Sequence, residues 1–206
     1  MRRLFPALFA TLAVTAGVAI IVLSPGMLAK FGATLAAAAL SVSNILFWSQ
    51  SGYFDTRNVL KPLLHTWSLS VEEQFYLIWP ALLWLLMSRW SMRGAAVAGA
   101  LIAVGIASFA LNALWVFGNF GEKAKFAIFF LTPFRVFEFA IGGVGFFLLS
   151  AVRNRVALQE VFMALGLALI GYSIATFDGT LIFPYWYGLL PSVGALLVIL
   201  SGQSTR

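Results

Sequence analysis

Uncharged apolar runs of about 20 residues recur along this chain, and they constrain its fold more than any other feature. The clearest is residues 94–117. A helix needs about 20 apolar residues to cross a bilayer, whereas barrel strands alternate apolar and polar residues over about 10. With 62% hydrophobic and 10% charged residues among 206, the chain is too apolar for a soluble fold. We therefore predict an all-α membrane protein and exclude a soluble enzyme, a nucleic-acid binder and a disordered tail.

The distribution of basic residues indicates how the chain crosses the membrane. A seventh apolar stretch, residues 31–48, is ambiguous because it is rich in alanine and contains polar side chains. Cytoplasmic loops carry excess Lys and Arg. If this stretch does not cross, seven basic residues share the side of both termini and five lie opposite; if it crosses, they divide six and six. The other apolar runs, predicted to span, are residues 4–23, 71–87, 94–117, 127–149, 157–177 and 186–200.

These counts favour a polytopic helical bundle with about six spanning helices and one re-entrant or interfacial helix at residues 31–48. Both termini are then cytoplasmic, and residues 24–70 form one long extracytoplasmic excursion. No internal repeat divides the chain, so we expect a single membrane-embedded domain over residues 1–206. The net charge of +6 mostly reports this topology.

The residue inventory removes several kinds of site. The chain has no cysteine, which excludes disulfides, thiolate nucleophiles and metal sites built on cysteine. His65 is its one histidine, so this chain cannot build a multi-histidine metal site. We expect neither a bound metal nor a bound cofactor.

Polar side chains gather at residues 65–76 (HTWSLSVEEQFY), where a predicted span begins. One interpretation is structural: Ser70 is an N-cap, Glu73 completes a capping box, and the Trp and Tyr belong to an interfacial belt. The other is functional, because an aromatic ring with carboxylates and an amide can hold a sugar by stacking and hydrogen bonds. The candidate sugar-binding residues are His65, Trp67, Glu73, Gln74 and Tyr76.

Two charged residues lie inside the predicted span 127–149. Arg135 and Glu138 are three residues apart and share a helix face. Each charge costs roughly 2.5–3.5 kcal/mol in a membrane helix, and such residues usually face a cavity or a partner. An internal salt bridge that only neutralises both is the alternative. Gly142 and Gly145 continue this face, where they permit close helix packing or leave room for a substrate channel.

Arg2 and Arg3 precede the first predicted span. They act either as plain positive-inside anchors or as a cytoplasmic site for an anionic group, because arginine binds phosphate in bidentate fashion.

Residues 65–76, with residues 51–55 (SGYFD) before them, resemble the signature of the acyltransferase type 3 family. Arg135, Glu138 and Gly142 match that family's Arg-x-x-Glu motif with its following glycines. Residues 3–7 (RLFPA) resemble the tail of its arginine-rich cytoplasmic motif. The family comprises bacterial inner-membrane O-acyltransferases, often O-acetylases of O-antigen lipopolysaccharide, exopolysaccharide or peptidoglycan. The resemblance covers nearly the whole chain in order.

The resemblance implies transfer of an acyl group, usually acetyl, from cytoplasmic acyl-CoA to an extracytoplasmic sugar hydroxyl. Arg2 and Arg3 would hold the CoA phosphates, and the excursion at residues 24–70 would present a glycan or lipid-linked sugar. Arg135 and Glu138 would line the route across the membrane. Glu72 or Glu138 would orient or charge-stabilise the general base.

The chain also departs from the family pattern. Family members have about ten spanning helices, and their catalytic histidine lies in a helix that we do not find here. His65 aligns with a different motif and does not replace it. We therefore expect an internal fragment that also lacks the last helix and is inactive alone. Two other functions stay open: a transporter with Arg135 and Glu138 as a gated ion pair, and a non-catalytic remnant that docks to partners.

Overall fold

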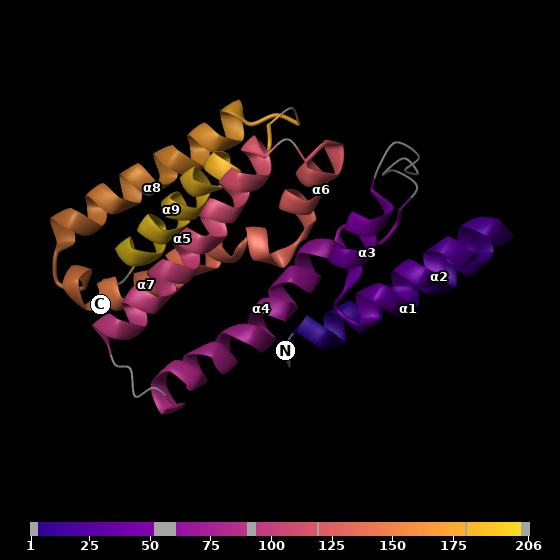
Figure 1. The fold of residues 1–206 in the computed structure, drawn as a ribbon, viewed down its shortest axis with the longest axis horizontal. Coiled ribbons are helices and arrows are strands. Elements are labelled where there is room, and N and C mark those ends of the chain that lie inside the picture. Colours follow the sequence, from indigo (N-terminus) through magenta and orange to yellow (C-terminus); the bar gives the residue numbers. More distant parts are fainter. Residues whose placement is uncertain (1–3, 52–60, 90–93, 119, 180, 203–206) are drawn as a thin grey trace. The chain divides into compact units, whose positions relative to one another are not determined.

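The computed structural model describes residues 4–51, 61–89, 94–118, 120–179 and 181–202. Within these ranges the regular structure is helical and contains no strand, which confirms the all-α prediction (Figure 1). Among the described residues, three helices are long and apolar enough to cross a membrane: α1 (Leu4–Val22), α5 (Ala95–Phe117) and α8 (Val156–Thr176). Two shorter helices, α7 (Val136–Val152) and α9 (Tyr185–Ser201), are also apolar. The predicted number of six spans stays a prediction.

The described residues group into two compact units. The first comprises those within Met1–Leu82 and Phe130–Thr132, and the second those within Leu83–Phe129 and Pro133–Arg206. These units are groups of residues in contact with one another, and such groups neither establish nor exclude separate domains. The single membrane-embedded domain over residues 1–206 therefore stays a prediction.

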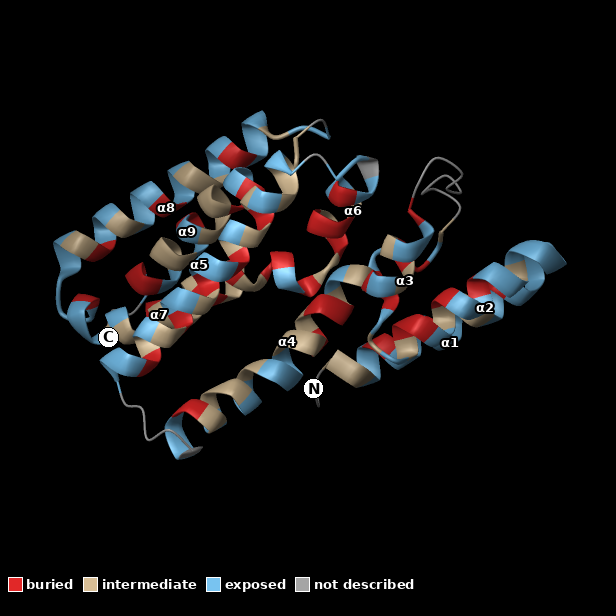
Figure 2. Ribbon diagram, viewed as in Figure 1, coloured by how far each residue is buried: buried red, intermediate tan, exposed pale blue. Residues whose placement is uncertain are grey.

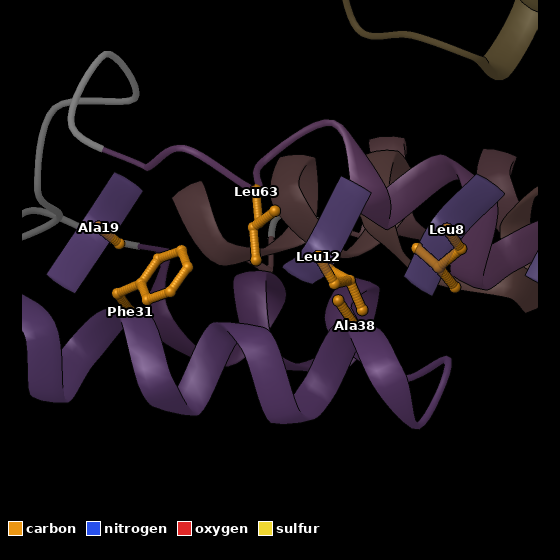
Figure 3. Close-up of a cluster of buried hydrophobic side chains, with 6 residues drawn as sticks. All are labelled: Leu8, Leu12, Ala19, Phe31, Ala38 and Leu63. Carbon is orange, nitrogen blue, oxygen red and sulfur yellow. The ribbon is translucent and has the colours of Figure 1, made fainter. Parts of the chain in front are cut away.

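The first unit is built on the pairing of α1 with α2 (Pro25–Ala39). Pro25 suits the first position of α2, where a backbone N–H would have no partner within the helix. Apolar side chains from both helices meet Leu63, which lies in the turn before α4 (Thr66–Trp84) (Figure 3). The buried cluster consists of Leu8, Leu12, Ala19, Phe31, Ala38 and Leu63.

The ambiguous stretch at residues 31–48 is not one helix. It contains the end of α2, a break at residues 40–42, and most of α3 (Ser43–Gln50). Ser41 turns the chain in the left-handed region, with φ of 58°. At 1.5 Å per residue, the 15 residues of α2 and the 8 of α3 are each too short to cross a hydrocarbon core of about 30 Å. This break favours the re-entrant or interfacial arrangement, which stays a prediction.

We expect residues 24 and 68 to lie on the same side of the membrane if residues 31–48 do not cross. The chain has no cysteine, so Ser24→Cys and Ser68→Cys each create a unique thiol at an exposed position. Both thiols should react with an impermeant maleimide in intact cells, whereas an Arg153→Cys thiol should react only after permeabilisation. Labelling of the first two from opposite sides would mean that the segment crosses.

In the second unit, α8 packs against α9, and α7 contacts both α5 and α9. The α8–α9 crossing is close because glycines meet there: a Cβ at Gly166 would lie 2.7 Å from the carbonyl oxygen of Gly194. Small residues allow such close packing between membrane helices. Much of the outer surface of α8 is exposed (Figure 2) and carries large apolar side chains such as Ile174, as expected for a helix that faces lipid.

The predicted continuous span at residues 127–149 is wrong. The chain forms α6 (Glu122–Phe130), then a 3₁₀ turn at Thr132–Phe134, and only then α7. Pro133 explains the break, because proline cannot donate a backbone hydrogen bond and disfavours helical geometry in the residue before it. The break places Arg135 at the residue before α7 instead of inside a helix.

Candidate functional site

Two helices of the first unit, α3 and α4, are joined by hydrogen-bonded polar side chains, which we call the α3–α4 polar network. Residues 130–132, the last residue of α6 and the two that follow it, belong to the same unit and complete the network. Four of its side chains come from one face of α4, because residues 70, 73 and 74 each lie three or four residues after another member, at 66 or 70. The members are Ser41, Ser43, Asn44, Thr66, Ser70, Glu73, Gln74 and Thr132.

One part of the network consists of hydroxyls. Thr66 Oγ1 donates to Ser43 Oγ at 3.0 Å, and the hydroxyls of Ser43 and Ser70 are 2.8 Å apart. All three side chains are buried. The N-cap prediction for Ser70 is therefore wrong: α4 begins at Thr66, one turn earlier, and Ser70 binds α3 instead of capping its own helix.

The other part consists of two amides and their partners. Gln74 Nε2 donates to Asn44 Oδ1 and to the carbonyl oxygen of Ser41, both at 2.9 Å. Asn44 is fully buried, and its Nδ2 donates to the carbonyl oxygen of Phe130 at 3.2 Å. Thr132 Oγ1 donates to Gln74 Oε1. These bonds tie α3, α4 and residues 130–132 together.

Glu73 is the buried carboxylate of the network, with 4% of its surface exposed. Ser41 donates its hydroxyl hydrogen to Glu73 Oε2. The predicted capping box is therefore wrong for Glu73 as well, since this carboxylate binds the turn between α2 and α3. Within the described part of the chain, Glu73 Oε1 is buried and accepts no hydrogen bond.

The sugar-binding candidates at residues 65–76 divide between two environments. Glu73 and Gln74 belong to the network, and Trp67 packs edge-on against Phe130 at 5.5 Å. His65 and Tyr76 are exposed. Glu72, which the sequence analysis named as a catalytic residue, is half-buried and lies outside the network. It has no ionic or hydrogen-bonding partner among the described residues.

Arg2 and Arg3 lie outside the described residues, as do residues 52–55 of the predicted signature.

Replacing Asn44 should destabilise the first unit. In Asn44→Leu the carbonyl of Phe130 and the amide of Gln74 lose buried partners, which costs about 1–3 kcal/mol of unfolding free energy. Thermal unfolding in detergent, followed by circular dichroism, measures the change. Gln50→Leu at the exposed end of α3 is the control. Equal melting temperatures for the two variants would contradict a stabilising network.

A second polar group lies at the start of α7, in the second unit. Arg135 Nη1 and Glu138 Oε2 are 3.4 Å apart, and Arg135 Nε donates to the carbonyl oxygen of Phe129 at 3.0 Å. The guanidinium carbon lies 5.3 Å from the ring centre of Phe129 and 5.4 Å from that of Phe183. The side chains of Arg135 and Glu138 are 10% and 20% exposed. The structure thus brings together the two residues predicted from their spacing.

Two polar residues of α5 support the break before α7. Ser108 Oγ lies 2.6 Å from the carbonyl oxygen of Pro133 and accepts the backbone N–H of Phe137 at 3.1 Å. Asn112 is fully buried, and its Nδ2 donates to the carbonyl oxygen of Phe134 at 2.8 Å. The sequence prediction missed both residues. Their four-residue spacing in an apolar span was the available signal, because such polar residues usually face protein.

Glycines leave space around Glu138. A Cβ at Gly188 in α9 would lie 2.8 Å from Glu138 Oε1, so this glycine makes room for the carboxylate.

The two glycines predicted on the face of Glu138 differ in their surroundings. A Cβ at Gly145 would meet the side chain of Leu196, whereas a Cβ at Gly142 would meet nothing within 4 Å. Gly145 therefore permits close packing against α9, and Gly142 does not.

Comparison with known proteins adds a functional direction. The chain is 34% identical over 116 residues to the peptidoglycan O-acetyltransferase OatA of Listeria monocytogenes, which is 56% of this chain and 18% of that protein. It is 32% identical over 93 residues to O-acetyltransferase OatA of Staphylococcus aureus, covering 45% of this chain and 15% of the relative. The chain therefore spans less than a fifth of the length of either protein.

No protein-family model matches the chain, and no solved structure matches it. The two similarities support a relationship to O-acetyltransferases over part of the chain. The resemblance to the acyltransferase type 3 family stays a prediction.

Proposed function

We propose that this chain is part of an enzyme for O-acylation of a cell-surface glycan, and that this enzyme moves an acetyl group from cytoplasmic acetyl-CoA to a sugar hydroxyl on the outer side of the bacterial cytoplasmic membrane. The similarity to two proteins named as O-acetyltransferases carries this proposal. The apolar helices α1, α5 and α8 support a location in the bilayer.

The buried Arg135–Glu138 pair supports acyl transfer at the start of α7. In the reaction, the sugar oxygen attacks the thioester carbonyl carbon, the C–S bond breaks, and CoA leaves as a thiol. Negative charge develops on the carbonyl oxygen, and a fixed cation in a site of low dielectric stabilises it. Arg135 supplies that cation, and Glu138, 3.4 Å away, holds the guanidinium in place.

The remaining roles follow the sequence prediction. A positioned base must take the proton of the weakly nucleophilic sugar hydroxyl. We assign Glu72 to orient or charge-stabilise that base. The sugar acceptor, free or lipid-linked, is assigned to His65, Trp67, Glu73, Gln74 and Tyr76, and the CoA phosphates to Arg2 and Arg3.

The proposal is tested by counting ester-linked acetyl groups on surface glycans. The gene that encodes this chain is deleted and then restored in its own host, and purified glycans are treated with mild alkali. We expect acetate release to fall on deletion and to return on restoration. Unchanged acetate release, together with altered uptake of a labelled solute, would favour the transporter instead.

A further inference from the structure

A pocket of about 330 Å³ lies in the second unit, and neither Arg135 nor Glu138 lines it. Its lining comes from the C-terminal end of α5, from residues 120–121, from α6, and from Ile182 in the connection before α9. The residues that matter for its chemistry are Trp115, Phe120 and Lys125.

Two aromatic rings form one wall of this α5–α6 pocket. The ring centres of Trp115 and Phe120 are 4.9 Å apart with an interplanar angle of 32°, and Phe134 packs against Trp115 at 5.4 Å. Phe120 is 58% exposed. Gly118 allows this arrangement, because a Cβ there would lie 2.9 Å from Phe120 Cδ2. An exposed ring, that of Phe120, thus lies beside Trp115.

A cationic side chain completes the lining. Lys125 lies on α6, is exposed and borders the pocket, whereas Lys123 on the same helix is exposed and does not line it. An ammonium group attracts a carboxylate as a compact point charge. In the topology predicted from the basic residues, both lysines lie on the extracytoplasmic side.

Aromatic rings beside a cation suit a sugar acid. The C–H groups on the apolar face of a pyranose carry partial positive charge, and aromatic ring faces carry negative charge, so the two stack. Small-molecule sites combine such apolar walls with a few polar groups that fix orientation. An interfacial aromatic belt with a lysine is the simpler alternative, but belt residues anchor in lipid and need no pocket.

We propose that the α5–α6 pocket binds a sugar ring that carries a carboxylate, stacked on Trp115 and Phe120 with its carboxylate at Lys125. That the pocket is a docking site for the acceptor glycan rests on the proposed function. That the pocket binds such a sugar does not depend on the proposed function.

The test measures binding of two probes to the purified chain in detergent by saturation-transfer NMR titration. Methyl glucuronide and methyl glucoside differ only in a carboxylate in place of a hydroxymethyl group. We expect the glucuronide to bind about three- to fivefold more tightly, as for an exposed charge pair. Lys125→Met should make the two affinities equal, and Trp115→Leu and Phe120→Ala should each weaken both.

Lys123→Met and Trp84→Leu are the matched controls, because Lys123 and Trp84 are exposed and do not line the pocket. Both should bind like the unaltered chain. Circular dichroism establishes that each variant is folded. If Trp115→Leu does not fold, Phe120→Ala alone tests the contribution of the aromatic rings to binding. Absence of binding to the unaltered chain, or binding that survives both ring variants, would overturn the pocket assignment. A glucuronide preference that survives Lys125→Met would overturn the role of the lysine.

The outcomes separate this inference from the proposed function. Sugar binding without any acetyl transfer by the gene product would refute the proposed function and keep the pocket. Acetyl transfer without sugar binding would overturn the pocket alone.

Discussion

Glu138→Gln should lower acetyl transfer by about 100-fold or more in membranes from cells that express the gene containing this chain. Glutamine keeps the size of the side chain but removes its charge. The guanidinium of Arg135, 3.4 Å away and only 10% exposed, then loses its counter-charge and its fixed orientation. The transfer rate is measured with labelled acetyl-CoA, and the amount of protein by immunoblotting of the membranes.

Glu160→Gln is the matched control, because Glu160 is an exposed carboxylate on α8. It should leave the transfer rate within about twofold of the original protein, as exposed ion pairs contribute little. The double variant Arg135→Met with Glu138→Met removes both charges together. Full activity in that variant would show that the pair serves only to neutralise itself, as buried ion pairs sometimes do.

The second large effect concerns the α8–α9 crossing. Gly166→Ala should lower the free energy of unfolding by about 1–3 kcal/mol, the usual cost of overpacking. The added methyl group would lie 2.7 Å from the carbonyl oxygen of Gly194 and 3.0 Å from the backbone nitrogen of Val198. Neither group can move without shifting α9. Thermal unfolding in detergent measures the difference.

Gly171→Ala tests the same substitution on the same helix without the close contact. A Cβ at Gly171 would meet nothing within 4 Å. Alanine there should leave stability unchanged or raise it by about 0.5–1 kcal/mol, because glycine in a helix interior is unfavourable. A destabilisation of similar size in both variants would mean that helix crowding at Gly166 is not the cause.

Apolar runs predicted the helices well, because a membrane helix must satisfy its backbone hydrogen bonds within itself. The run at residues 94–117 corresponds closely to α5, and the pairing of Arg135 with Glu138 followed from their spacing. The prediction of one continuous span at residues 127–149 was wrong because hydropathy does not reveal a break in the helical backbone. Pro133 was the signal for that break, together with the polar partners Ser108 and Asn112 in α5.

The α3–α4 polar network shows the limit of local patterns. Ser70 and Glu73 have the spacing of a capping box, yet both bind residues near the break between α2 and α3. Asn44 and Gln74 are 30 residues apart, and their contact depends on how the helices pack. Nothing local in the sequence distinguishes a capping serine from one that binds another helix.

Transfer of acetyl groups across the membrane is the central claim, and inverted membrane vesicles test it most directly. Labelled acetyl-CoA is supplied outside these vesicles, on the side that was cytoplasmic, and alkali-labile label is measured on glycan in the lumen. We predict label on lumenal glycan in vesicles that contain the gene product, and almost none in vesicles with Glu138→Gln. Equal lumenal labelling with and without the gene product would contradict a role in O-acetylation.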